Sequence, residues 1–184
     1  MKTLIINGSP RPAGDTAAMI EALRSRLSGE VFELSAYRAD IRPCVDCRFC
    51  HSHARCAVDD DMREVYSDDY ESIVVASPVY YGSLTPPVLA IASRLQIYHA
   101  AKHFRGEPIA RSSKRGAVLL AGGGKGNPDE AKRVSRVILR ILGAGLEAEN
   151  IVASLNTDEM PARLDAAAIG KAREIGARLA GSII

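Results

Sequence analysis

Four cysteines and three small-residue loops are the parts of this sequence whose residue types and spacing could support chemistry. Cys44, Cys47, Cys50 and Cys56 follow the spacing C-x2-C-x2-C-x5-C within one short segment. Thiolates bind soft metal ions and also take part in redox reactions. The three loops contain Gly, Ser, Thr and Tyr, which are suited to holding a ligand. They are Gly8–Thr16, Ser77–Ser83 and Ala121–Pro128.

The first loop has the features of an anion site. It follows an apolar run and opens a helical pattern, so its backbone N–H groups and the positive helix end can face a phosphate. Ser9 and Thr16 can donate hydroxyl hydrogen bonds, and Arg11 can pair with the charge. The loop lacks Gly-x-Gly-x-x-Gly and the P-loop Lys, which favours a monophosphate over a nucleoside triphosphate. The alternative is a plain strand–helix turn.

The other two loops could hold a flat ring. Tyr80 and Tyr81 could form a wall for an aromatic ligand. The alternative is that one Tyr packs inward and the other lies on the surface. The glycine-rich loop Gly122–Gly126 would let a ligand approach the backbone closely, and Lys125 could balance charge. Its alternative is a flexible loop before a helix that is capped at Asn127 or Asp129.

Five apolar runs alternate with helical patterns and must position these loops. The chain predicts an α/β fold with a five-stranded parallel sheet, strand order 2-1-3-4-5, and helices on both faces. We predict a single domain, residues 1–184. Within it only residues 36–58 do not fit the repeat, and they form an irregular insertion that carries the cysteines. The predicted strands are Leu4–Ile6, Val31–Leu34, Ile73–Ala76, Ala117–Leu120 and Ala148–Val152. The predicted helices are Thr16–Leu27, a short one ending at Tyr66, Thr85–Ala101, Asp129–Leu142 and Leu164–Leu179.

Composition limits the class of protein. The chain of 184 residues is 47% hydrophobic with a net charge of +2, which gives no sign of a nucleic-acid or membrane partner. No apolar run reaches the roughly 18–20 residues of a spanning helix. The first residues read as a strand and not as a signal peptide. We therefore expect a cytoplasmic protein, in which the thiols stay reduced.

Two sets of motifs resemble a known family. Asn7–Arg11, Asp15-Thr16 and Ser77–Gly82 resemble the NAD(P)H-dependent FMN reductases of the flavodoxin-like superfamily. Pro43, the four cysteines and Asp60–Met62 resemble its iron–sulfur flavoprotein branch. The resemblance implies a flavodoxin-like three-layer sandwich, FMN as cofactor, NAD(P)H as co-substrate and a homodimer or homotetramer.

The resemblance also implies roles for individual residues. It assigns phosphate binding to Ser9, Arg11 and Thr16. It assigns contacts with the flavin ring to Pro78, Val79, Tyr80, Tyr81 and Gly82. The predicted cofactor-binding set is completed by Ala13, Gly14, Asp15, Gly122, Gly123, Gly124 and Lys125. Asp15 departs from the family, where Asn is common, so its carboxylate must turn away from the phosphate. The segment Thr85-Pro86-Pro87 also departs from the family, which often has small residues and Gln there.

The cysteine segment has three interpretations. Cys44, Cys47, Cys50 and Cys56 could hold a four-iron–four-sulfur cluster, because a tight run of thiolates on an irregular loop can wrap one cubane. Zinc with help from His51 and His53 is a second possibility, and thiols without metal are the third. His99 and His103 are predicted to be structural or surface residues. Lys132, Arg133, Arg136 and Arg140 are predicted to form a solvated helix face.

The resulting functional hypothesis is an FMN-binding oxidoreductase. It would transfer electrons from NAD(P)H to a quinone, a flavin or another small-molecule or protein acceptor. No side chain is predicted to be catalytic, because the cofactor carries the chemistry. One alternative is an iron–sulfur flavoprotein that acts as an electron carrier. Another is a non-enzymatic flavodoxin-like binding module.

Overall fold

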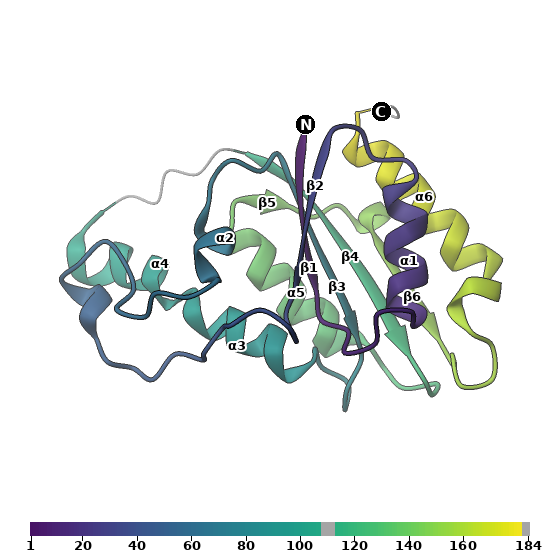
Figure 1. Cartoon of the computed structure of the whole chain (residues 1–184), viewed down its shortest axis with the longest axis horizontal. Helices are drawn as coiled ribbons and strands as arrows, with labels where there is room; N and C mark the ends of the chain where they lie inside the picture. The colour runs from purple at the N-terminus through teal and green to yellow at the C-terminus, as the bar shows by residue number, and fades with distance from the viewer. Residues whose placement is uncertain (108–112, 182–184) are drawn as a thin grey trace.

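A parallel β-sheet forms the centre of the computed structural model, which describes residues 1–107 and 113–181 (Figure 1). The order is β2-β1-β3-β4-β5, and β6 also pairs with β4. The predicted order and parallel direction are therefore confirmed. The strands of the described residues are β1 Lys2–Asn7, β2 Glu30–Ser35, β3 Ser72–Pro78, β4 Lys114–Gly122, β5 Ala144–Gly145 and β6 Ile151–Leu155.

The predicted count of five strands is wrong, because two strands share one side of β4. β5 pairs with Lys114 and Arg115, whereas β6 pairs with Val118–Gly122. A two-residue strand is too short to show a pattern in the sequence. The predicted fifth strand, Ala148–Val152, begins instead with a single 3-10 turn over Ala148–Asn150 (η3). β6 alternates between partly buried and buried residues, as an edge strand does.

Helices cover both faces of the sheet. α1 and α6 lie on one face, and α3 and α5 lie on the other (Figure 1). The helices are α1 Asp15–Arg24, α2 Met62–Tyr66, α3 Pro86–Arg94, α4 Gln96–Ala100, α5 Asp129–Ile141 and α6 Ala166–Leu179. Shorter turns are η1 Phe49–His51, η4 Ala162–Leu164 and the π-helical turn η2 Ala101–Arg105. None of the described helices is long and apolar enough to cross a membrane.

Alternate residues of the central strands face opposite layers. Leu4 and Ile6 of β1 belong to the apolar core that also contains Ile91 of α3 and Ile138 of α5. Ile5 belongs to the core that contains Met19 and Leu23 of α1 and Ile175 of α6. Because both faces are buried, the strands read as continuous apolar runs.

The predicted helix Thr85–Ala101 is broken in the structure. α3 ends at Arg94, and the N–H of Leu95 donates to Ala92 O at 3.1 Å, a tighter i to i−3 bond. Next to the break, Ser93 Oγ accepts a hydrogen bond from Cys44 N at 3.0 Å. Contacts with the cysteine segment thus coincide with the break, and no local pattern in the helix sequence predicts it.

Candidate functional site

The three predicted loops lie at one edge of the sheet. β1, β3 and β4 are neighbours, and their carboxyl ends point the same way (Figure 1). Backbone bonds hold the loops together at their starts. Gly8 N donates to Ala76 O at 2.7 Å, and Val79 N donates to Ala121 O at 2.8 Å. This edge is the point where ligands bind in doubly wound sheets.

The first loop leaves helix N–H groups available at the start of α1. Gly14 occupies the N-cap position and has no side chain that could bond them. The side chains of Ser9 and Thr16 are both buried. Ser9 Oγ accepts a hydrogen bond from Arg11 N and donates one to Arg11 O, both at 3.2 Å, which curls the loop around the hydroxyl. The helix N–H groups fit a phosphate group, and the Ser9 hydroxyl would bond it by turning from Arg11 O.

Asp15 has partners that turn it toward another element. Its Oδ1 accepts a hydrogen bond from Ala162 N at 2.8 Å, at the start of η4. Its Oδ2 lies 3.7 Å from Arg11 Nη2. The carboxylate that looked out of place beside a phosphate therefore ties α1 to the segment before α6. The Arg11 side chain remains 71% exposed.

Thr85 packs directly under the first loop. It stands at the N-cap position of α3 with Pro86 following, as predicted, but its hydroxyl donates to Gly8 O at 2.8 Å. A Cβ at Gly8 would lie 2.5 Å from Val88 and 2.8 Å from Thr85 Oγ1. Glycine is therefore required at position 8 by close packing against α3.

The second loop presents two tyrosines on a tight turn. Tyr80 and Ser83 exchange two backbone hydrogen bonds of 2.9 Å each. The two residues between them, Tyr81 and Gly82, have φ of 50° and 80°, the left-handed region that a two-residue hairpin turn requires. Tyr81 is fully exposed and Tyr80 is 41% exposed, so neither ring packs inward.

Tyr37 was missed by the sequence reasoning and lies beside Tyr80. It follows β2, on the other side of β1 from β3. Burial raises the pKa of Tyr37, and the neighbouring Tyr80 phenol raises it further. Its position just after a predicted strand was the only signal available. The two phenols together form an aromatic surface against which a flat ring can pack.

The third loop is held by a segment that the sequence reasoning also missed. Gly122 O, Gly123 O and Gly124 O accept hydrogen bonds from Thr157, Asp158 and Asn156 N at 2.9, 3.2 and 3.1 Å. A Cβ at Gly123 would lie 2.6 Å from Asp158 Oδ2. The glycine at 123 therefore makes room for Asp158, while Gly124 and Gly126 face open space. Asn127 Oδ1 accepts a hydrogen bond from Asp129 N at 2.8 Å, but Pro128 occupies the N-cap position of α5, so the predicted cap at Asn127 or Asp129 is wrong.

The four cysteines line one cleft of about 390 Å³, together with Arg94 and His99. All four thiols are free. Burial raises the pKa of Cys50, and the nearby Cys56, Cys44 and Cys47 raise it further. Within residues 1–107 and 113–181, no three His, Cys, Asp or Glu side chains converge as metal ligands. The donor set fits a cluster in its chemistry, but the sulfurs share a cleft without forming a cage.

The two histidines considered for zinc have other contacts. The His51 ring stacks on Phe104 at 3.8 Å between centroids, and the His53 ring stacks on Phe49 at 3.9 Å. His53 Nδ1 also lies 3.2 Å from Phe49 O. These stacks hold the imidazoles as packing groups of the cysteine segment.

A buried ion pair between Arg94 and Asp60 joins the two ends of the cysteine segment. Arg94 donates to Arg42 O at 2.8 Å and to Val58 O at 3.1 Å, the carbonyls just before and after the four cysteines. Asp60 accepts from Arg94 at 2.6 Å and from Met62 N at 3.1 Å. Arg105 donates to Cys50 O at the far end. Hydrogen bonds from Arg94 and Arg105 thus hold the backbone of the cysteine segment in place.

The fold belongs to a known class. A structure of the azoreductase AzrA superposes with a TM-score of 0.69 at 16% identity, over 97% of this chain and 100% of that one. A flavodoxin from the domain Archaea superposes with a TM-score of 0.58 at 18% identity, over 98% and 97%. The predicted flavodoxin-like fold is therefore confirmed.

The sequence comparisons define the family more narrowly. The pattern of the NADPH-dependent FMN reductase family matches residues 1–157, and the chain belongs to this family. An iron–sulfur flavoprotein of Methanosarcina thermophila is 30% identical over 135 residues, 71% of this chain and 68% of that protein. One of Archaeoglobus fulgidus is 34% identical over 125 residues, 64% and 60%. The chain spans between about half and two thirds of the length of the curated relatives it matches.

Proposed function

We propose that this chain is an FMN-binding oxidoreductase that uses NAD(P)H to reduce a quinone, a flavin or another acceptor. The observation that carries the proposal is the meeting of the three loops at one edge of the sheet. Its first loop offers free helix N–H groups beside two buried hydroxyls. Membership of the NADPH-dependent FMN reductase family supports the same cofactor.

In this proposal each loop has one task. Ser9, Arg11, Thr16 and the N–H groups of the first turn of α1 bind the phosphate. The residues of the second loop contact the ring, and the backbone from Gly122 to Lys125 bonds its polar edge. FMN, when bound, supplies the acceptance of a hydride and the onward release of electrons. The protein orients the ring and leaves one face open to substrates.

A visible spectrum and a stopped-flow reaction test the proposal. Anaerobically purified protein should carry FMN, or take it up, and mixing with NADPH or NADH should bleach the flavin absorbance quickly. A colourless protein that cannot be reconstituted with FMN would instead indicate a non-enzymatic binding module. A flavin that neither nicotinamide reduces would contradict the reductase activity.

The shared cleft of the four cysteines favours a second candidate function. The curated relatives are named iron–sulfur flavoproteins, and Cys44, Cys47, Cys50 and Cys56 could hold a four-iron cluster here. Such a cluster supplies one-electron steps and would make the chain an electron carrier. Iron, sulfide, zinc and FMN assays on one anaerobic sample distinguish cluster, zinc and free thiols. About four iron and four sulfide per chain are expected for the cluster.

We also propose a cytoplasmic location and a homodimer or homotetramer. Four free thiols are compatible with a reducing compartment. Sedimentation velocity of the flavin-loaded protein measures the assembly directly. A monomer across the concentration range would contradict the oligomer.

A further inference from the structure

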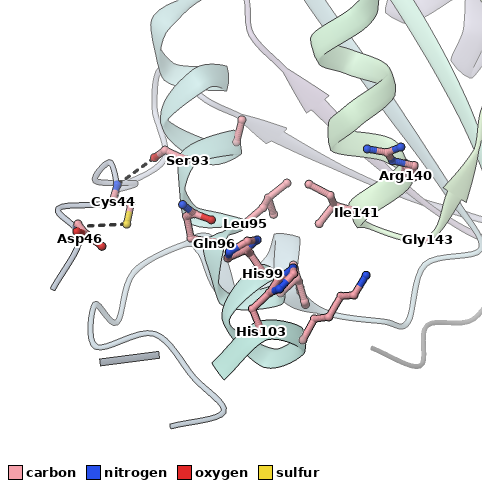
Figure 2. Close-up of a pocket in the computed structure, with 13 residues that line it drawn as sticks. Cys44, Asp46, Ser93, Leu95, Gln96, His99, His103, Arg140, Ile141 and Gly143 are labelled. Carbon is pink, nitrogen blue, oxygen red and sulfur yellow. Dashed lines mark hydrogen bonds between the residues drawn. The ribbon is translucent and has the colours of Figure 1, made fainter. Parts of the chain in front are cut away.

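A second, larger cleft shares Cys44 with the cysteine cleft (Figure 2). It has a volume of about 940 Å³ and is formed by the end of α3, by α4 and η2, and by the end of α5. Cys44, Asp46, Gln96 and His99 line both this cleft and the cysteine cleft, so the two adjoin. We call it the basic cleft, after the lining residues Lys102, Arg140, His99 and His103.

The cations of the basic cleft come from two separate elements. Lys102 belongs to η2 and Arg140 to α5. Within the part of the chain that the structure describes, neither forms an ion pair within 4.0 Å. The acidic lining residue, Asp46, is paired with Arg48 at 3.7 Å. The cleft therefore carries uncompensated positive charge that would favour an anion.

The rest of the lining is flat or apolar. The rings of His99 and His103 stack at 4.2 Å between centroids, with 29° between their planes. Leu95 and Ile141 point toward one another from the two sides (Figure 2). The two histidines are four residues apart, but their stacked rings do not converge on a point. This surface suits a planar ring better than a metal ion or a small inorganic anion.

We propose that the basic cleft binds a small aromatic anion, a planar ring system that carries a carboxylate or sulfonate. The ring packs against the His99–His103 stack and the aliphatic side chains, and the anionic group pairs with Lys102 and Arg140. Arg140 is exposed, as predicted for this helix face, and also lines the cleft, whereas Arg136 is equally exposed and does not line it.

This site is separate from the proposed flavin site. The third loop precedes the first residue of α5, and Arg140 lies near the last residue of that 13-residue helix. At about 1.5 Å per residue the two lie roughly 15–20 Å apart. The proposal therefore does not depend on FMN binding, and each can fail without the other.

Isothermal titration calorimetry with a matched pair of probes tests the proposal on the full chain as purified. Naphthalene-2-sulfonate should bind with one site per chain, and the neutral naphthalene-2-sulfonamide should bind at least about ten-fold more weakly. Arg140→Met and Lys102→Met should each weaken sulfonate binding by about ten-fold, because each removes a charge-assisted contact. Arg140→Lys should retain most of the affinity.

Arg136→Met is the matched control, since it removes the same charge from the same helix outside the cleft. It should leave sulfonate binding unchanged. Equal affinity for both probes, or equal losses in Arg136→Met and Arg140→Met, would overturn the proposal. So would a cleft closed by a subunit contact. In that case sedimentation velocity would show Arg140→Met dissociating an oligomer, with no sulfonate binding to either form.

Discussion

The guanidinium of Arg94 donates to the carboxylate of Asp60 at 2.6 Å, and both side chains are almost fully buried. Thirty-four residues separate them in sequence. The pair joins α3 to both ends of the cysteine segment through Arg42 O and Val58 O. The shape of the cleft that holds the four thiols therefore depends on this pair.

Removing one partner of this pair should be costly. We expect Arg94→Met to lower the free energy of unfolding by about 3–5 kcal/mol, because it leaves the Asp60 carboxylate buried without its cation. Urea denaturation measures the loss. Arg133→Met is the control, because it breaks an exposed pair with Glu130 at 2.7 Å and should cost less than about 1 kcal/mol. Similar losses in both variants would contradict the role of the buried pair.

Asp60 should also make stability depend on acid pH. Burial alone would raise the pKa of Asp60, but hydrogen bonds from Arg94, Met62 and Arg42 lower it below its ordinary value of 3.8. A carboxylate whose pKa is lower in the folded state stabilises that state at pH values above the unfolded pKa. This stabilisation is lost as the pH falls through the folded pKa. We expect a steep loss of unfolding free energy below about pH 4.

The comparison of Asp60→Asn with its neighbour isolates this effect. Asp60→Asn should flatten the decline of the unfolding free energy below pH 4, measured by urea titrations at several pH values. Asp59→Asn changes an exposed carboxyl next to it in sequence and should follow the wild type. Parallel curves for all three proteins would rule out Asp60 as the source.

The phosphate role of the first loop can be separated from its ring contacts. Ser9→Ala and Thr16→Val should each weaken FMN binding to apoprotein by about ten-fold, the value of one hydrogen bond to a charged group. Riboflavin, which lacks the phosphate, should bind with unchanged affinity. Fluorescence titration measures both ligands, and Ser28→Ala is an exposed control. An equal loss for riboflavin would show that the loop has been distorted.

Asp15 should matter for stability and not for the cofactor. Asp15→Ala removes the acceptor of Ala162 N, so the unfolding free energy should fall by about 1 kcal/mol. FMN affinity should stay the same or increase, because a negative charge leaves the neighbourhood of the phosphate. Asp15→Asn retains an acceptor oxygen and should keep most of the stability. A large loss of FMN affinity at unchanged stability would place the carboxylate in the cofactor site.

Two neighbouring glycines should respond differently to the same change. Gly123→Ala places its Cβ 2.6 Å from Asp158 Oδ2, so this exposed carboxylate must turn to another rotamer, which should cost about 1 kcal/mol. Gly124→Ala meets open space and should stay within about 0.5 kcal/mol of the wild type. Thermal unfolding measures both. The double variant Gly123→Ala/Asp158→Ala should recover part of the loss, and a failure to do so would contradict the contact.

The sequence by itself determined the sheet, its order and the edge at which the loops meet. Apolar runs such as Leu4–Ile6 and Ile73–Ala76 are local signals, and the alternation of strands and helices allows few topologies. The loop Gly8–Thr16 could be recognised because its Gly, Ser and Thr residues adjoin a strand and a helix start. The cysteine segment stood out because its spacing falls within 13 residues.

Only the tertiary structure decided which distant residues meet. Arg94 with Asp60, Tyr37 with Tyr80, and Asp158 with Gly123 each join segments that no local pattern links. The edge shared by β5 and β6 depends on the full length of β4, which offers room for both. The basic cleft arises because the broken α3–α4 helix brings Lys102 to the same cavity as Arg140. Long-range packing brings the charges of Lys102 and Arg140 together, and the periodicity of the sequence does not predict this arrangement.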